Sequence, residues 1–497
     1  MFFSGRKAPP TVPTDDIIYL SPTDDTRTLR HVSLVVCLYF EHVLDPQRLC
    51  DALEVLLTSS REWRYLGGRL RLDTKTNRLQ VHVPQAFSKQ RPAFRYTHYD
   101  HGSTSIASDG SQAGFLASLA ALSQSSISLL PGDTSVAHLF KDVASPKALR
   151  DWIYTDNPIL SLHITSFSDA TCVGLGMSHT IADAGAARVI VYAWNQVLAG
   201  KAPPPLPERL FSSKDSKGAR EPVFDPDPFD IVKLGHDGKD AAVAPHLVRG
   251  WRLFLQLVVI VLELVLYRRE VKRLIHLPKA FVQDLHKDAM RDLPTGTWVS
   301  SNDVVSAWLV KTAFPHSRYP HGVTYVQTID LRGKNVGIAP TALGNRFLRT
   351  LTRVDTSLGP LTIQKNAVAI RQSIQCHTTE EEIRRQAALR ASRHSFDDHF
   401  YRVGKSIYFL NSSATSMMGP IMDWSGASCA DSVARNPSNL VSPRWIWAIV
   451  DLDGLPERHA SYMTRDREGA FWIQLIRAEK DWNAIEHELA GQAVIVN

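Results

Sequence analysis

Apolar and polar positions alternate along the chain in patterns that predict short strands and amphipathic helices. The runs 162–167 and 171–177 are rich in β-prone residues and are joined by the turn-like Ser168-Asp169-Ala170, which is typical of a β-hairpin. A helix is expected directly after residue 183, because four apolar residues recur at helical spacing before a glycine suited to a helix end: Ala186, Ile190, Ala193, Val197 and Gly200. The sequence therefore predicts a hairpin that leads into a helix.

Similar patterns occur in both halves of the chain. The first half contains an extended segment at 32–40 and an amphipathic stretch at 46–57. The second half predicts helices and strands in mixed order: helices 302–314, 361–374 and 482–489, and strands 323–329, 445–450 and 470–476. Because strands and helices mix without a strict alternation, we expect the α+β class.

The longest region rich in turn and loop residues separates two halves. Four of the five residues at 203–207 are prolines, and two further segments rich in turn residues follow, Ser212–Gly218 and Asp225–Pro228. A chain of 497 residues is too long for one compact core. We therefore expect a first domain at 1–205, a crossover at 206–245 and a second domain at 246–497.

One apolar run, Leu253 to Tyr267, stands apart from the rest of the chain. It is too short to span a membrane comfortably, and Gln256 and Glu263 interrupt it. Arginines flank both of its ends: Arg249, Arg252, Arg268 and Arg269. Two interpretations stay open, namely a helix packed on the protein and a helix lying on a membrane surface as a peripheral contact.

Composition excludes several classes of protein. With 44% hydrophobic and 21% charged residues, the chain fits globular averages. Its net charge of +6 comes from dispersed residues rather than a basic stripe, so nucleic acid is not an expected partner. The five cysteines are scattered without metal-ligand spacing, and their odd number argues against a disulfide framework. Since the first residues also lack a secretory signal pattern, we expect a cytoplasmic protein with no metal site.

Candidate chemistry centres on His179. The spacing His-x-x-x-Asp occurs four times, at His138, His179, His236 and His394, but only His179 lies between a predicted strand and a predicted helix. A neutral histidine, with an ordinary pKa of about 6.5, can take a proton from a hydroxyl near pH 7. Six small residues surround it and would leave room for a substrate: Gly174, Gly176, Ser178, Ala182, Ala184 and Gly185. A core histidine that only satisfies backbone groups is the competing interpretation.

Several motifs of other enzyme classes are absent from the sequence. No Gly-x-Ser-x-Gly elbow, no zinc-like His/Cys cluster, no Gly-x-Gly-x-x-Gly and no phosphate-binding Gly-x4-Gly-Lys-Ser/Thr loop is present. These absences favour direct group transfer over a covalent enzyme intermediate, and they disfavour nucleotide-driven and metal-driven chemistry.

His179-Thr180-Ile181-Ala182-Asp183, in its strand-to-helix setting, resembles the catalytic motif of the BAHD acyltransferases. Further segments resemble family motifs in the same order: Tyr19–Asp24, Trp63–Leu70, Ser300–Trp308, Asp330–Lys334 and Gly344-Asn345. The stretch 167–200 is most similar to fungal acyltransferases of secondary metabolism, including those that resemble trichothecene O-acetyltransferase. The second family motif is represented by Asp423–Ala427, which keeps the aspartate and an aromatic residue but loses both expected glycines.

The resemblance implies two chloramphenicol-acetyltransferase-like domains, each a mixed sheet with flanking helices, in a monomer. It implies acetyl-CoA or another acyl-CoA as co-substrate, with no permanently bound cofactor, and a small hydroxylated metabolite, a polyketide or terpenoid, as acceptor. His179 would act as general base, while Asp183 would be turned away and paired with an arginine, for which Arg332 is the candidate. Ala184 replaces a family glycine, and Gly185 is expected to supply the lost backbone freedom.

The resemblance also suggests residues for two further tasks. Ser412 and Ser413 are candidates to stabilise the oxyanion, with a role in shaping a turn as the alternative. Ser300, Ser301 and Asp423 are candidates for coenzyme A binding, although serines near a helix start also serve as caps.

Two other functions stay open at this stage. A non-catalytic ligand-binding or regulatory relative could keep the fold, as the altered Asp423–Ala427 motif would allow. A condensation-type domain of peptide synthetases shares the architecture, but such domains usually carry a double histidine, and here Ser178 precedes His179.

Overall fold

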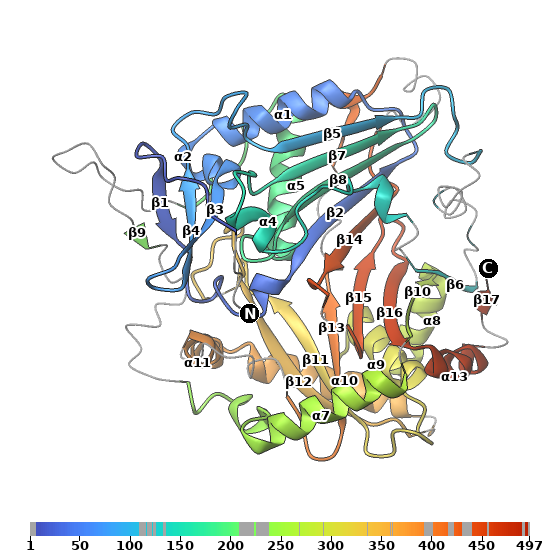
Figure 1. Ribbon diagram of the computed structural model, residues 1–497. Coiled ribbons are helices and arrows are strands. Elements are labelled where there is room, and N and C mark those ends of the chain that lie inside the picture. The colour runs from blue at the N-terminus through green and yellow to red at the C-terminus, as the bar shows by residue number, and fades with distance from the viewer. Residues whose placement is uncertain are drawn as a thin grey trace.

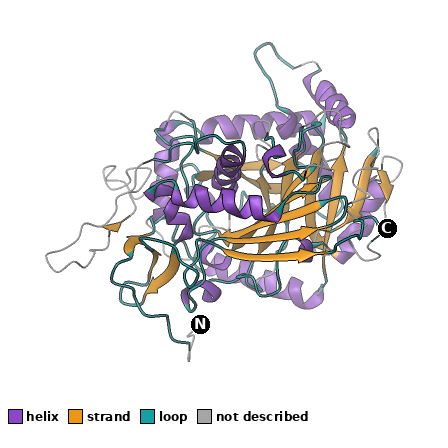
Figure 2. Ribbon diagram, turned by 90° about the horizontal axis from the view of Figure 1, so that it is seen from above, coloured by secondary structure: helices purple, strands orange, loops and turns teal. Residues whose placement is uncertain are grey.

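Two large mixed β-sheets and one small sheet organise the chain (Figure 1). Seen from above, strands lie at the centre and helices lie around them (Figure 2). The computed structural model describes residues 6–108, 116, 122, 126–132, 136–207, 223–224, 238–267, 269–291, 293–334, 336–357, 359, 361–391, 401–415, 422–429, 440–454, 457–489 and 493–495. The mixed sheets and flanking helices confirm the predicted α+β class.

The first large sheet has five strands in the order β14-β2-β8-β7-β5. Their bounds are Trp445–Asp451 for β14, Ser33–Phe40 for β2, Thr171–Ser178 for β8, Ser161–Ser166 for β7 and Arg95–Asp100 for β5. β7 and β8 pair in antiparallel register, so the predicted hairpin is confirmed. Every residue of β2, β7 and β8 is buried, as expected for strands covered on both faces.

Two helices cover one face of this sheet and share its hydrophobic core. They are α1, Pro46–Thr58, and α5, Ala184–Leu198, and both match amphipathic stretches expected from the sequence. The indole of Trp194 on α5 donates to the carbonyl of Leu49 on α1 at 3.0 Å. Gly200, just after α5, has φ +69°, a conformation that favours glycine at a helix end.

The second large sheet has eight strands in the order β12-β11-β13-β15-β16-β10-β6-β17. Their bounds are Phe347–Val354, Val323–Asp330, Ile407–Ser413, Ala460–Arg465, Phe471–Ala478, Glu270–Leu277, Ile127–Pro131 and Ala493–Ile495, in that order. Its main core is shared with four helices: α8 Lys279–Met290, α9 Ser301–Ala313, α10 Thr362–His377 and α13 Glu479–Leu489.

The two halves exchange strands between the large sheets. β6 comes from the first half of the chain and pairs with β10 in the eight-stranded sheet, whereas β14 comes from the second half and pairs with β2 in the five-stranded sheet. The sheets are therefore tied together by chain segments far apart in sequence. The domain boundaries at 205 and 246 stay a prediction, and most of the crossover 206–245 lies outside the described residues.

The described part of the chain also contains a small sheet and four further α-helices. The small sheet has the order β3-β4-β1-β9, with bounds Arg69–Asp73, Arg78–Val83, Asp16–Tyr19 and Val223–Phe224. The remaining α-helices are α2 Arg61–Arg64, α4 Arg150–Ile153, α11 Glu380–Ala391 and α7 Trp251–Leu266.

The apolar run near residue 260 forms α7, which lies near the lower edge of the molecule in Figure 1. One side of α7 is half-buried against the protein, but none of its residues is buried. Within the described segments, no helix is long and apolar enough to cross a membrane.

Candidate active site

The junction between β8 and α5 carries His179 and Asp183. β8 ends at Ser178, and the backbone N–H of His179 donates to the carbonyl of Val32 at 2.9 Å, which fixes the chain as it leaves the sheet. Asp183 is the N-cap of α5, because its Oδ1 accepts from the backbone N–H of Ala186 at 2.8 Å. The local sequence thus places the histidine in a tight turn between two rigid elements.

Asp183 is buried and paired with Arg332. Oδ1 of Asp183 lies 2.8 Å from Nη2 of Arg332, and Oδ2 accepts from Nη1 at 3.2 Å and from the backbone N–H of Arg346 at 2.8 Å. Arg332 also donates to the carbonyls of Ala342 and Gly344. Burial opposes ionisation of Asp183, but the guanidinium more than offsets it, so the pKa of this carboxyl lies below its ordinary value. The carboxylate is held toward arginine rather than toward the imidazole.

Gly185 makes this ion pair possible through its lack of a side chain. A Cβ there would lie 2.2 Å from Nη1 of Arg332 and 2.7 Å from Oδ2 of Asp330. Gly185 is not among the glycines with positive φ, so the expectation that it supplies backbone freedom is wrong. Its contribution is close approach of the guanidinium to the start of α5.

Three sequence motifs meet behind His179. The carboxylate of Asp24 accepts from the backbone N–H of Asn345 at 2.6 Å and from its Nδ2 at 2.9 Å, and it pairs with Arg346 at 3.2 Å. Nδ2 of Asn345 also donates to the carbonyl of His179 at 2.9 Å. Ala182 and Gly344 form a parallel β-bridge beside these bonds. Asp24 and Asn345 therefore position His179, a role that neither of their motifs reveals in the sequence.

His179 itself is half-buried and lines a large cavity. Its Nδ1 is buried and makes no hydrogen bond with any described residue. Burial lowers the pKa of His179, although its own carbonyl, Asp183, Asn345 and Asp24 act in the opposite direction. The imidazole is consequently neutral at pH 7 and able to accept a proton.

The other histidines with the same spacing lack this setting. His138 is exposed on a short 3-10 helix, Ala137–Leu139. His236 and His394 lie outside the described residues.

The cavity has a volume of about 330 Å³ and lies between the two large sheets. Both halves of the chain contribute to its wall, which is largely apolar. The apolar lining residues include Val32, Leu34, Val36, Ala187, Phe347, Leu410, Trp447, Val450, Ala460 and Met463. Polar and charged side chains also contribute to the wall: His179, Thr28, Asp183, Thr328, Asp330, Arg349, Tyr408, Ser412, Ser413, Glu457, Arg458, Tyr462 and Thr464. A largely apolar cavity that also carries polar groups is typical of small-molecule sites.

Only part of the small-residue stretch around His179 faces this cavity. Ala184 and Gly185 line it, as expected. Gly174 and Gly176 instead allow neighbouring parts of the protein to pack closely. A Cβ at Gly174 would lie 1.7 Å from the carbonyl oxygen of Phe140, and a Cβ at Gly176 would lie 2.5 Å from Oγ of Ser161. The expectation that these two glycines open a path for substrate is wrong.

Ser412 and Ser413 both line the cavity at the end of β13. The hydroxyl of Ser413 donates to Oδ1 of Asn302 on α9 at 3.0 Å and lies 3.4 Å from Thr415 Oγ1. The structure therefore brings both candidate oxyanion residues to the same cavity as His179, and it engages Ser413 in a contact with the protein.

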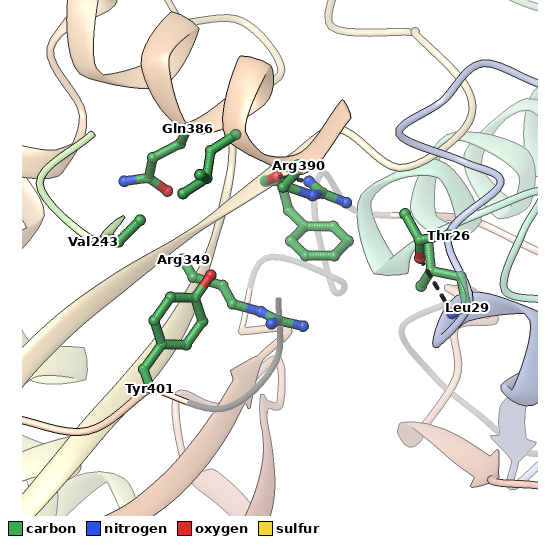
Figure 3. A pocket seen from close by; sticks show the side chains of 9 residues that line it. Thr26, Leu29, Val243, Arg349, Gln386, Arg390 and Tyr401 are labelled. Atoms are coloured by element: carbon green, nitrogen blue, oxygen red, sulfur yellow. Dashed lines mark hydrogen bonds between the residues drawn. The ribbon is translucent and has the colours of Figure 1, made fainter. Parts of the chain in front are cut away.

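A second cavity adjoins the first and shares Leu29, Phe347 and Arg349 with it (Figure 3). Its volume is about 20 Å³, which is enough for one water molecule but not for a substrate. Arg390 of α11 lies at its wall, donates to the carbonyls of Phe347 and Thr23, and ties α11 to the Tyr19–Asp24 motif.

Ser300 and Ser301 lie at the start of α9 and are not among the residues that line the cavity. Ser300 is the N-cap: its Oγ accepts from the backbone N–H of Asp303, and the Asp303 carboxylate accepts from the backbone N–H of Ser300. Nη2 of Arg371 donates to the same Oγ at 2.8 Å. The hydroxyl of Ser300 is thus occupied by a capping box, which is the alternative expected for serines at a helix start.

Asp423 and its motif brace α5 rather than line the cavity. Asp423 accepts from the backbone N–H and the hydroxyl of Ser425, and its carbonyl accepts from Asn195 of α5 at 2.6 Å. Trp424 is buried edge-on against Trp194 of α5. A Cβ at Gly426 would lie 2.2 Å from the carbonyl oxygen of Leu198, so this glycine, which does not stand at either expected glycine position of the motif, permits close packing on the helix end.

The chain is similar to known acetyltransferases over nearly its full length. It is 28% identical to acetyltransferase pyiB of Pyricularia grisea, covering 96% of this chain and 94% of that protein. It is 27% identical to acetyltransferase adrJ of Penicillium roqueforti, covering 98% of each. A relative named transcriptional regulator calD, from Penicillium decumbens, is 26% identical and covers 97% of each. No protein-family model matches the chain.

Solved structures share the fold at lower identity. TRI101 of F. sporotrichioides, complexed with coenzyme A and T-2, superposes with a TM-score of 0.61 at 14% identity, covering 95% of this chain and 97% of that one. Vinorine synthase superposes with a TM-score of 0.55 at 15% identity, covering 97% and 94%. The full-length relatives and the shared fold support the resemblance that the motifs indicate: this chain is similar to fungal acetyltransferases and has the fold of TRI101 and vinorine synthase, as expected for a BAHD-type acyltransferase.

Proposed function

We propose that the protein transfers an acyl group, most readily acetyl, from a coenzyme A thioester to a hydroxyl of a small, largely apolar metabolite such as a polyketide or terpenoid. The observation that carries this proposal is the neutral imidazole of His179 at the wall of a mostly apolar cavity. The acetyltransferase relatives, and the coenzyme A and T-2 of the TRI101 complex, support the same chemistry.

The proposed reaction begins with proton transfer to His179. The imidazole takes the proton of the acceptor hydroxyl as its oxygen attacks the thioester carbonyl carbon. The new carbon–oxygen bond produces a tetrahedral oxyanion, which then collapses as the carbon–sulfur bond breaks. The departing coenzyme A thiolate takes the proton back from the imidazolium. His179 is thus returned to its neutral form, and the products are the acyl ester and free coenzyme A.

Ser412 is the proposed donor to the oxyanion. It lines the same cavity as His179, and its neighbour Ser413 already donates its hydroxyl to Asn302. A hydroxyl aimed at a developing negative charge in an apolar cavity stabilises the transition state more than the substrate. Asp183 and Arg332 hold the turn in place and take no proton in this scheme.

Coenzyme A release with acetyl-CoA and a panel of hydroxylated polyketides and terpenoids tests the proposal. We expect turnover with the wild-type protein and a loss of at least about 10²-fold in kcat for His179→Ala, the low end of the contribution of a general base. His138→Ala is the matched control, because it removes an exposed histidine with the same spacing to an aspartate. Turnover that survives in His179→Ala would refute the assignment of the base. Amine analogues of accepted alcohols distinguish O-transfer from N-transfer.

A regulatory role is the second candidate function. It is supported by the relative named transcriptional regulator calD, which matches as much of the chain as the acetyltransferases do. A regulator of this kind would bind a small molecule in the cavity without acyl transfer. Wild-type protein that neither binds nor hydrolyses acetyl-CoA in the presence of any acceptor would favour this role over catalysis.

A further inference from the structure

Helix α7, Trp251–Leu266, presents an apolar surface to solvent along its whole length. None of its 16 residues is buried, whereas the shorter α1 and α5 bury much of one side. Large apolar side chains are exposed at both ends and in the middle, among them Trp251 at 69%, Phe254 at 67% and Leu266 at 68%. A helix that is apolar on nearly every side is normally buried in a core or in lipid.

The two polar residues in the interior of α7 face the protein, whereas Arg252 near its start is exposed. Gln256 and Glu263 lie on the half-buried side of the helix. The carboxylate of Glu263 lies 3.3 Å from Nε2 of His459. At the end of the helix, Arg458 donates to the carbonyl of Tyr267, and the ammonium of Lys480 lies over its ring. The usual arrangement of a surface helix is therefore inverted, and these contacts hold the apolar side outward.

The ends of α7 carry the residues expected at a lipid headgroup boundary. Trp251 begins the helix and Tyr267 follows it, and these two residue types favour the membrane–water interface. Arg252 lies over the Trp251 ring, and Arg269, 81% exposed, lies 3.6 Å from Glu479 beyond the other end. The helix is about 24 Å long at 1.5 Å per residue, so it is too short to span and would lie flat.

Charge decides between a membrane and a second copy of the chain as the occupant of this surface. Pairing two copies through α7 would bring arginines against arginines at one or both ends of the contact. Anionic lipid headgroups are complementary to the same arginines, and the acyl region accepts the apolar side chains between them.

We propose that α7 docks this protein on the surface of an anionic membrane, with its exposed apolar side chains at the boundary between headgroups and acyl chains. The segment that anchors α7 also lines the large cavity, through Arg458 and Ala460. Docking would therefore hold one wall of the cavity near the lipid, so that an apolar acceptor can enter from the membrane. This last consequence rests on the proposed acyl transfer, whereas the docking does not.

Flotation with vesicles tests the docking directly. The full chain is mixed with vesicles of phosphatidylcholine alone or of phosphatidylcholine with phosphatidylserine, and the bound fraction is measured after centrifugation through a density gradient. We expect binding to the vesicles that contain phosphatidylserine. The triple variant Phe254→Gln/Val261→Gln/Val265→Gln should lose about tenfold or more in partition, because three outward side chains no longer enter the apolar region. Arg252→Gln/Arg269→Gln should weaken the preference for phosphatidylserine.

A matched variant controls for a general loss of surface hydrophobicity. Val55→Gln/Val143→Gln/Leu361→Gln changes three comparably exposed apolar residues away from α7 and should bind vesicles as the wild type does. Wild-type protein that binds neither vesicle would overturn the proposal, and so would a dimer in sedimentation velocity that the α7 triple variant abolishes. Acyl transfer to a water-soluble acceptor should be unchanged in the triple variant, so a failure of the proposed activity is distinguishable from a failure of docking.

Discussion

The substitution Asp183→Asn separates a structural role of this residue from a catalytic one. In the wild type, Oδ1 accepts from the Ala186 N–H and faces Nη2 of Arg332, while Oδ2 accepts from the Arg346 N–H and faces Nη1 of Arg332. Asparagine has one oxygen and one NH₂ group. Whichever way it is turned, its NH₂ group faces a pair of donors, so one of the two sets of hydrogen bonds is lost.

The expected cost follows from these contacts. Breaking a buried ion pair by removing one partner costs about 3–5 kcal/mol. In the variant, Arg332 keeps a 2.8 Å contact with Asp330 and two hydrogen bonds to backbone carbonyls. The free energy of unfolding should therefore fall by an amount near the low end of that range, about 3 kcal/mol. For unfolding of all 497 residues together, the entropy corresponds to about 1 kcal/mol per degree, so Tm should fall by about 3 °C.

Two assays are needed on the same preparation: Tm by calorimetry and kcat well below Tm. We expect the lower Tm with kcat within about tenfold of wild type. Asp45→Asn is the matched control, since Asp45 caps α1 through Gln47 and Arg48 at an exposed position and should lose only a few tenths of a kcal/mol. An unchanged Tm combined with a fall in kcat of about 10⁴-fold, the effect of losing the aspartate of a catalytic triad, would refute the structural role.

Three further predictions concern the same site. Because burial lowers the pKa of His179, the neutral base persists below pH 6.5, so the acid limb of kcat/KM against pH should have its midpoint below 6.5; a midpoint above 6.5 would contradict this. Gly185→Ala should displace Arg332 and cost about 1–3 kcal/mol, measured by urea unfolding, and wild-type stability would show that the guanidinium can move freely. Ser412→Ala should lower kcat by about 10²-fold with little change in KM, whereas Ser413→Ala should leave kcat near wild type; the reverse order would exchange their roles.

Local patterns were sufficient to predict the elements that carry His179. The hairpin β7–β8 and the helix α5 follow from periodicity within about forty consecutive residues, and the structure contains all three. The exchange of β6 and β14 between the sheets could not be predicted in this way, because the partner of a strand depends on residues hundreds of positions away. The alternation of residues along a strand specifies which side chains lie on each face of the sheet, but it does not specify which strands pair with that strand.

The residues that position His179 were missed for a related reason. Asp24 and Asn345 are 321 positions apart, and neither has a local pattern that reveals a bond to the other. The sequence predicts backbone freedom as the function of Gly185, because it does not show the guanidinium that lies against this residue. Gln256 and Glu263 are seven residues apart, so the sequence places them on one face of α7. Only the fold shows that this face turns toward the protein.

The altered motif at Asp423–Ala427 is compatible with catalysis because it is physically separate from the residues that hold His179 in position. Asp24, Asn345, Asp183 and Arg332 hold the turn that carries His179, and none of them contacts the altered loop through a hydrogen bond described here. The loop instead braces the far part of α5 through Asn195 and the Trp194–Trp424 contact. Changes within it alter packing on that helix, whereas the position of the base is set by the network at the other end of the same helix.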